Sequence, residues 1–370
     1  MSDPTALPIT PLRYQPSHES LEKDEAETTR ELTETLHKIV EIVHKDEGHA
    51  YRGVHAKTHG LLFAELQVAA GLPAYLAQGL FAQPGTYPVV MRLSTAPGDL
   101  LDDAISTPRG VGLKVIGVPG ERAEGSEGDL TQDFLMVNGP VFSAPTAKAF
   151  LRPLKLLAAT TDKAPGLKKV LAAALRGLEA IVEKAGGESA TLKTLGGHPE
   201  THILGETFYT QVPLLYGPYI AKLSLAPVSA GLTALTDAPV DLKDKPNGLR
   251  DAVTAHFAGQ GGEWDLRVQL CTDIETMPVE DASVQWPEDV SPFVTVARLV
   301  ARPQVAWSPA RAAAVDDGMA FTPWHALAAH RPIGSIMRVR QAVYRMTAGF
   351  RSQNNATPVQ EPRALNGLPD

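Results

Sequence analysis

The strongest indication of the fold is the stretch Arg340-Gln341-Ala342-Val343-Tyr344, which Arg351 follows farther along the same apolar-periodic run. We expect this stretch to lie on a helix over about residues 333–350. At roughly 100° per residue, Arg340, Tyr344 and Arg351 fall within about 40° of one another on such a helix. The tyrosine therefore lies between two arginines on one helical face.

A tyrosine in this setting can act as an anion. A free tyrosine titrates near pH 10, so it becomes a phenolate only where a nearby cation favours the charged form. Arg340 lies one helical turn before Tyr344, and its guanidinium stays protonated. A tyrosinate is one of the few protein side chains that ligate haem iron. An ordinary surface helix is the simpler interpretation of this stretch alone, so the rest of the chain has to decide.

Composition and charge exclude several classes of partner. The chain has 370 residues, 44% of them hydrophobic, and a net charge of −8. We therefore expect a sizeable core and no nucleic-acid or membrane partner. Residues 1–14 show no signal-peptide pattern, and apolar stretches such as residues 170–175 are too short to span a bilayer. The single Cys271 excludes an internal disulfide framework, which fits a cytoplasmic protein.

The chain divides into an arm, one large domain and a tail. Residues 1–20 are proline-rich and predict an N-terminal arm, and residues 353–370 predict a polar C-terminal tail. We expect residues 21–352 to form a single domain, because no shift in composition marks an internal boundary. Within it, the apolar spacing predicts an amphipathic helix over residues 22–44 and a helical insert over residues 145–184.

Eight other runs have the β-branched and alternating character of strands. These runs cover residues 61–69, 89–95, 110–118, 133–137, 207–215, 219–225, 264–272 and 293–300. Eight strands with one helical interruption and a closing helix favour an α+β fold, a closed antiparallel eight-stranded β-barrel with surrounding helices. Gly110-Val111-Gly112 lacks a third glycine and leads into a strand, so it does not predict a dinucleotide loop.

Four blocks upstream carry the residues with the most suggestive chemistry. In chain order they are Tyr51-Arg52-Gly53-Val54-His55-Ala56-Lys57, Arg92-Leu93-Ser94-Thr95, Pro108-Arg109-Gly110 and Asn138-Gly139-Pro140-Val141-Phe142. His55 precedes the first strand, so we expect it to project from a barrel entrance into the interior. Farther along, His198 and His202 have a spacing found in metal sites, but Gly197 and Pro199 predict a loop there.

These blocks, in this order, resemble the catalase family. The stretch His330-Arg331-Pro332-Ile333-Gly334-Ser335, followed by Arg340, Tyr344 and Arg351, resembles the short, catalase-related haem proteins in particular. The resemblance extends over about residues 50–351. It implies a catalase-like fold, a haem b cofactor whose C-terminal helix supplies the iron ligand, and hydrogen peroxide as a substrate.

The resemblance also implies roles for three residues above the haem. His55 would be the base that takes a proton from one peroxide oxygen and returns it to the departing one. Asn138 would hydrogen-bond the bound peroxide. Ser94 would hold the imidazole of His55 in one tautomer.

On the other side of the haem, the resemblance implies that Tyr344 ligates the iron and that Arg340 keeps the Tyr344 phenol oxygen ionised. Phe142 would pack near the porphyrin. Three arginines would pair with the two haem propionates, for which the guanidinium geometry is suited. They are Arg52, Arg92 and Arg351.

Some positions depart from the pattern of large catalases. Thr107 stands where those enzymes have an aspartate before the Pro-Arg-Gly block, and Ala96 replaces the usual valine. Arg345 replaces the proline that usually follows the tyrosine. These changes favour a peroxidase with weak catalase activity that accepts organic reductants or hydroperoxides.

Alternatives from other classes stay open. One is a haem hydroperoxide isomerase or peroxygenase of the allene oxide synthase type, although Val54 stands where that type has threonine. Another is a non-catalytic barrel protein that encloses an apolar ligand. We also expect a homo-oligomer, and a dimer is the commonest such assembly.

Overall fold

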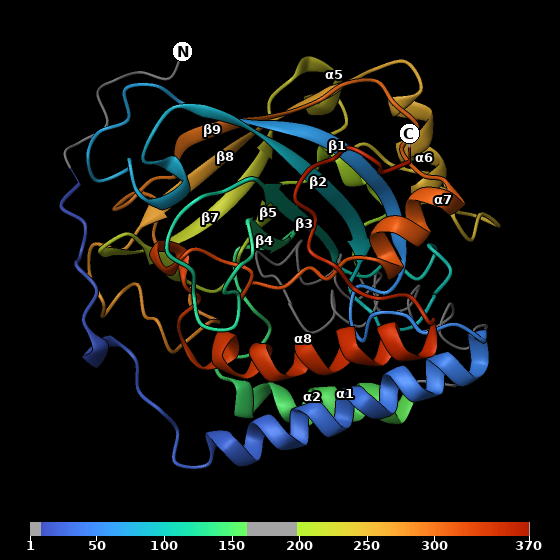
Figure 1. The fold of residues 1–370 in the computed structure, drawn as a ribbon, viewed down its shortest axis with the longest axis horizontal. Coiled ribbons are helices and arrows are strands. Elements are labelled where there is room, and N and C mark those ends of the chain that lie inside the picture. Colours follow the sequence, from blue (N-terminus) through green and yellow to red (C-terminus); the bar gives the residue numbers. More distant parts are fainter. Residues whose placement is uncertain (1–8, 161–197, 370) are drawn as a thin grey trace, which may run out of the picture.

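The computed structural model of the chain describes residues 9–160 and 198–369. One antiparallel sheet dominates the fold (Figure 1). Its strands are β1 Thr58–Val68, β2 Gly85–Thr95, β3 Arg109–Ile116, β4 Thr131–Val137, β5 Phe208–Tyr209, β6 Leu214–Tyr216, β7 Tyr219–Pro227, β8 Gly262–Leu270 and β9 Val294–Ala301. The order is β5-β4-β3-β2-β1-β9-β8-β7, and a β5–β7 pairing closes it. The predicted α+β fold with a closed eight-stranded barrel is therefore confirmed, and short β6 extends from the edge of β7.

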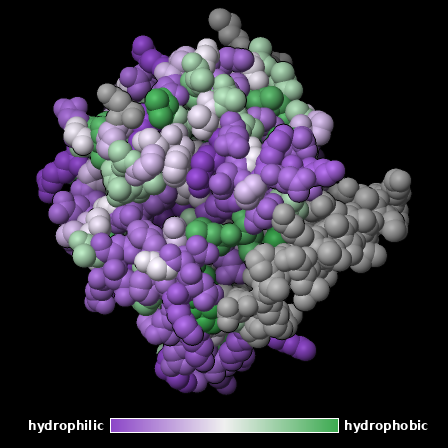
Figure 2. Space-filling view, turned by 90° about the vertical axis from the view of Figure 1, so that its right-hand side faces the viewer, coloured by the Kyte–Doolittle hydropathy of each residue, from purple (hydrophilic) through white to green (hydrophobic). Residues whose placement is uncertain are grey.

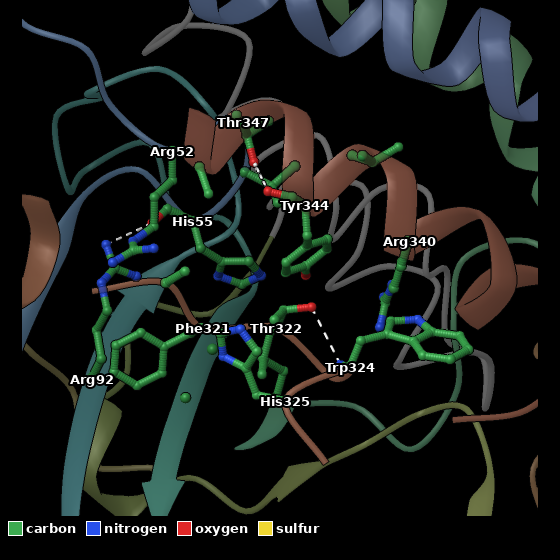
Figure 3. Close-up of a pocket in the computed structure, with 18 of the residues that line it drawn as sticks. Arg52, His55, Arg92, Phe321, Thr322, Trp324, His325, Arg340, Tyr344 and Thr347 are labelled. Carbon is green, nitrogen blue, oxygen red and sulfur yellow. Dashed lines mark hydrogen bonds between the residues drawn. The ribbon is translucent and has the colours of Figure 1, made fainter. Parts of the chain in front are cut away.

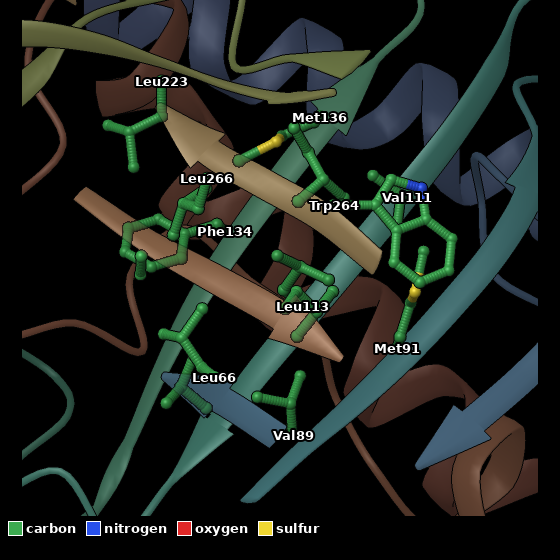
Figure 4. Close-up of a cluster of buried hydrophobic side chains, with 14 of the residues drawn as sticks. Leu66, Val89, Met91, Val111, Leu113, Phe134, Met136, Leu223, Trp264 and Leu266 are labelled. Carbon is green, nitrogen blue, oxygen red and sulfur yellow. The ribbon is translucent and has the colours of Figure 1, made fainter. Parts of the chain in front are cut away.

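The barrel interior is filled with apolar side chains. Alternate residues of a strand face opposite sides of a sheet, and in β3 Val111 and Leu113 lie in the main core cluster. Phe134 and Trp264 come from other strands into the same core (Figure 4). Burying each such side chain stabilises the fold by roughly 1.5–3 kcal/mol. A packed interior leaves no room for His55, so the expectation that its ring enters the barrel is wrong.

Three longer helices form a layer on one side of the barrel. They are α1 Glu25–Glu47, α2 Ala147–Thr160 and α8 Ser335–Asn354. Figure 1 shows α8 between the barrel and the other two. One apolar cluster joins the three helices, with Ile39 of α1, Leu154 of α2 and Val343 of α8 among its buried members. Gly48 ends α1 in the left-handed conformation at φ 68°, which glycine adopts without strain.

Shorter helices occupy the connections. They are the 3₁₀ turns η1 Pro16–His18, η2 Gly79–Phe81, η3 Ile203–Gly205 and η5 Ala328–His330, the α-helices α5 Ala230–Thr233, α6 Gly248–Phe257 and α7 Pro309–Ala312, and the π turn η4 Ala313–Asp317. The sequence had not predicted α6. None of the helices within the described part of the chain is long and apolar enough to span a membrane.

Most predicted elements agree with the structure to within a few residues. The helices expected over residues 22–44 and 333–350 are α1 and α8. The strand run over residues 207–215 is instead divided into β5 and β6, because Gln211 adopts φ 61° and Pro213 cannot donate to a ladder. The predicted helical insert begins as α2, and its part beyond residue 160 lies outside the described residues.

The C-terminal residues return to the barrel rather than leaving it. The backbone N–H of Gln360 donates to the carbonyl oxygen of Gly318 at 2.9 Å. Leu365 and Leu368 pack against an apolar cluster on the outer face of the barrel wall. Elsewhere the surface is mainly hydrophilic on the face shown in Figure 2. The large hydrophobic side chains that are exposed among the described residues are Leu21, Val290 and Val305.

Candidate functional site

A cavity of about 450 Å³ lies between the outer wall of the barrel and α8. One side is formed by outward-facing residues of β2, β3 and β4, and the other side by one face of α8. The contributing residues include Arg92, Ser94, Gly110, Gly112, Leu135 and Val137 from the strands, and Arg340, Val343, Tyr344, Thr347 and Arg351 from the helix. The periodicity of α8 thus brings Arg340, Tyr344 and Arg351 to one face, as the sequence indicated.

His55 and Tyr344 project into this cavity from opposite sides, His55 from the segment before β1 and Tyr344 from α8 (Figure 3). The backbone of His55 has φ 53°, an unfavourable conformation for a residue with a side chain. Two features hold it there. Its N–H donates to the carbonyl oxygen of Ala96 at 2.8 Å, and its ring lies against Gly110, where a Cβ would come within 2.4 Å of the imidazole. Strain of this kind often accompanies a functional role.

Ser94 orients the imidazole of His55. Nδ1 lies 3.1 Å from Oγ of Ser94, and the same hydroxyl lies 3.5 Å from the carbonyl oxygen of Gly110, to which it can donate. A hydroxyl that donates to the carbonyl accepts from Nδ1–H, which leaves the lone pair on Nε2. Burial, together with the nearby Arg92 and Arg340, lowers the pKa of His55 to about 3. The ring is therefore a neutral base near pH 7.

Three guanidinium groups gather at one edge of the cavity. Arg92 pairs with Asp316 at 2.6 Å. Arg52 donates to the carbonyl oxygens of Asp316 and Met319 at 3.2 and 3.1 Å, and Arg351 donates to the same two carbonyls. The carboxylate of Asp316 pairs with Arg92, whereas Arg52 and Arg351 donate to backbone carbonyl oxygens, so this edge carries more guanidinium than paired carboxylate charge.

The surplus affects the arginines themselves. Burial, with the charges of Arg351 and Arg92, lowers the pKa of Arg52 well below its ordinary value. Burial is also the main cause that lowers the pKa of Arg351 to about 10. The Nε atoms of Arg52 and Arg351 are buried and find no hydrogen-bond partner among the described residues. Anionic ligands at this edge would relieve the repulsion and accept the unused hydrogens.

Arg340 and Phe142 form a pair at the α8 side. The guanidinium of Arg340 lies 5.6 Å from the ring centre of Phe142, and that ring packs 5.0 Å from Phe150. Arg340 forms no ion pair with any residue the structure describes. Arg340 lines the cavity and Phe142 is not among the described residues that line it, so contact between Phe142 and a porphyrin stays a prediction.

Asn138 follows β4, and its side-chain amide hydrogen-bonds to Glu206 and to the backbone of Arg109. Nδ2 donates to Oε2 of Glu206 at 2.7 Å, and Oδ1 accepts from the backbone N–H of Arg109 at 2.8 Å. Its neighbour Val137 lines the cavity. A contact between Asn138 and a peroxide also stays a prediction.

A buried ionic cluster closes another part of the cavity wall. Nζ of Lys114 lies 2.8 Å from Asp133 and 2.5 Å from Glu361, and Nδ1 of His325 lies 3.2 Å from Glu361. Burial would lower the pKa of His325, but hydrogen bonds to Asp133 and Glu361 raise it to about 9. The two carboxylates and the imidazole have the spacing of metal ligands, yet the Lys114 ammonium already lies among them. No short motif marks this cluster, because its members come from β3, β4, the segment before α8 and the C-terminal tail.

Comparison with solved structures shows that the chain has the catalase-like fold. It matches a fungal catalase at 17% identity with a TM-score of 0.56, over 88% of this chain and 66% of the other. A bacterial catalase matches at 16% identity and 0.56, over 89% and 64%. Catalase A from Saccharomyces cerevisiae matches at 15% identity and 0.57, over 88% and 69%. The chain thus spans about two thirds of the length of these catalases. No protein-family model and no curated protein matches the sequence.

Proposed function

We propose that this protein is a haem-dependent oxidoreductase that acts on hydrogen peroxide, a peroxidase of the short catalase-related type with weak catalase activity. The observation that carries the proposal is one cavity with a phenol and a neutral imidazole on opposite sides and surplus guanidinium charge at one edge. The likeness to catalases of known structure supports it.

The residues of the cavity suit haem b. Gly110 and Gly112 have no side chains, which lets the rings of His55 and Phe321 lie close against β3 at the cavity. Two propionates would help to neutralise Arg52, Arg92 and Arg351, and bidentate guanidinium geometry fits carboxylates. Tyr344 would ligate the iron, and Arg340 would favour the anionic form of the phenol oxygen.

When bound, the haem would supply the redox chemistry of the iron, with electron donation from a phenolate. The protein residues would move the proton. His55 would accept it at Nε2 from a peroxide oxygen and return it to the other oxygen. Ser94 would keep Nδ1 protonated so that Nε2 stays available. Asn138 would donate an amide hydrogen to the peroxide.

The alternatives differ in their support. A barrel that encloses an apolar ligand loses its premise, because the interior is packed with side chains. An isomerase or peroxygenase of the allene oxide synthase type would use the same cavity, so only its substrate distinguishes it from a peroxidase. Ala96 and Thr107 lead us to propose organic reductants or hydroperoxides as second substrates. A homo-oligomer, for which a dimer is the default, and a cytoplasmic location complete the proposal.

The test is to load purified protein with haem and record its absorption spectrum and peroxide consumption. We expect a Soret band, a high-spin ferric tyrosinate spectrum and loss of peroxide that a dye substrate accelerates. Tyr344→Phe should lose the tyrosinate spectrum or the haem itself, whereas Tyr209→Phe, on β5, should behave like the wild type. An unchanged spectrum in Tyr344→Phe would exclude Tyr344 as the iron ligand. Protein that retains no haem after loading would exclude the function.

A further inference from the structure

A buried polar network adjoins the cavity where β3 begins and β4 ends. Arg109 immediately precedes Gly110 and Asn138 immediately follows Val137, and Gly110 and Val137 are paired in the sheet and line the cavity. The carboxylate of Glu206 accepts hydrogen bonds from both Arg109 and Asn138. Arg109 is fully buried, so its charge must be matched from within the protein.

The side-chain amide of Asn138 has one orientation. A backbone N–H can only donate, so the N–H of Arg109, 2.8 Å away, requires the amide oxygen to face it. The amide nitrogen then faces Oε2 of Glu206 at 2.7 Å and Nε2 of His198 at 2.7 Å. Both of its hydrogens are therefore directed at residues that do not line the cavity.

The contact with Glu206 is the firmer of the two. Oε1 of Glu206 also accepts from Nη1 of Arg109 at 2.6 Å and from Oγ1 of Thr201 at 2.9 Å. Burial would raise the pKa of Glu206, but the charge of Arg109 and the hydrogen bonds from Asn138 and Thr201 lower it overall. Glu206 is thus an anchored carboxylate, and charge-assisted hydrogen bonds are about twice as strong as neutral ones.

His198 holds the amide less firmly. Nη1 of Arg109 lies 2.8 Å from Nδ1, and the amide nitrogen of Asn138 lies 2.7 Å from Nε2. A neutral imidazole has only one lone pair, so only one of these two donors can form a hydrogen bond with it. The carbonyl oxygen of Pro199, 3.1 Å from Nδ1, favours a hydrogen on that nitrogen. With Nδ1 protonated, Nε2 can accept from Asn138. A neutral imidazole is nevertheless a weaker acceptor than the carboxylate of Glu206, so the contact with His198 is the one that a ligand can replace.

We infer that Glu206 is a positioning residue of this site, which acts on a ligand above the haem through the amide of Asn138. The inference rests on the proposed function, because only there does Asn138 meet peroxide. Asn138 lies one residue beyond the cavity wall, and both amide hydrogens face Glu206 and His198, so an N–H reaches a ligand only when the contact with the weaker acceptor, His198, is given up. A carboxylate that bridges Asn138 and the buried Arg109 sets the tilt of the amide.

The experiment compares Glu206→Gln, Asn138→Ala and the double variant, all loaded with haem. Cyanide is the probe, and its dissociation constant is read from the Soret shift, with KM and kcat for hydrogen peroxide measured separately. We expect Glu206→Gln to keep the haem spectrum and to raise both the cyanide dissociation constant and KM about tenfold, as loss of an oriented hydrogen bond does. The double variant should be no weaker than Asn138→Ala alone.

Two variants serve as controls. Asp265→Asn also removes a carboxylate that pairs with an arginine, Arg298, on the barrel surface, and it should match the wild type. Glu206→Asp keeps the charge with a shorter reach, and it should recover part of the cyanide affinity. It also replaces Glu206→Gln in the comparison if the latter does not fold.

The outcomes separate the two ideas. If the effects of Glu206→Gln and Asn138→Ala multiply in the double variant, or if Glu206→Gln binds cyanide as the wild type does, the positioning role is wrong. If the wild type itself neither holds haem nor consumes peroxide, the proposed function is wrong.

Discussion

Replacing Gly110 with alanine should disable the site without removing any residue that we propose binds the haem. The new Cβ would lie 2.4 Å from Cε1 and 2.7 Å from Nδ1 of His55, whereas ordinary contact begins at 3.4 Å. The ring must therefore move by about 1 Å, because β3 is paired on both sides, with β2 and with β4, and cannot yield. Misplacing a catalytic group by about 1 Å costs on the order of 100-fold in rate.

The assay is peroxide consumption by the haem-loaded variant, with the Soret band as the measure of haem content. Haem content should stay near that of the wild type, because Tyr344 and the arginine edge are untouched. Overpacking should also lower the free energy of unfolding by about 1–3 kcal/mol. Gly349→Ala on α8 is the matched control, since a Cβ there meets nothing within 4 Å. A Gly110→Ala enzyme with full haem and a rate within about threefold of the wild type would refute this account of His55.

Three further changes test other parts of the site. His55→Ala should retain the haem spectrum and lose at least about 100-fold in peroxide consumption, as removal of a general base does; unaltered turnover would place the base elsewhere. Ser94→Ala should cost less, about tenfold, because the ring stays but its tautomer is no longer held, and added imidazole should not restore the rate. Glu361→Gln should lower the melting temperature most near pH 5–6. The pKa of Glu361 is lowered to about 2, so its carboxylate contributes its full stabilisation above about pH 4.3. The pKa of His325 is raised to about 9, so its stabilisation is complete below about pH 6.5 and is lost as the pH rises through 9. A melting difference that is equal at pH 6 and pH 10 would contradict this.

Nearly all of the strands could be predicted from the sequence, because their runs are rich in β-branched residues or alternate apolar and polar residues. In β3 this alternation places Val111 and Leu113 on one face and Gly110, Gly112 and Lys114 on the other. Periodicity identifies the two faces but does not say which of them closes around the core. That depends on the sheet as a whole, and for this reason the position of His55 outside the barrel was not predictable from its own block.

The arginine edge was only half visible in the sequence. Arg52, Arg92 and Arg351 were expected to meet, and the structure brings them together around Asp316. Asp316 itself lies in a π turn that no motif marks. The sequence could therefore indicate where the arginines gather, but it could not indicate that Asp316 in η4 would pair with one of them.

The sequence by itself determined the elements whose signals are local: the strand pattern, α1, α8, and the face of α8 that carries Arg340, Tyr344 and Arg351. Only the tertiary structure decided which side of the barrel wall holds the cavity and which distant groups complete it. Glu361 reaches Lys114 and Glu206 reaches Arg109 across long stretches of chain. Such pairs form because a buried charge must find an opposite charge or a hydrogen-bond partner, and the folded chain, not its local pattern, sets which partner is near.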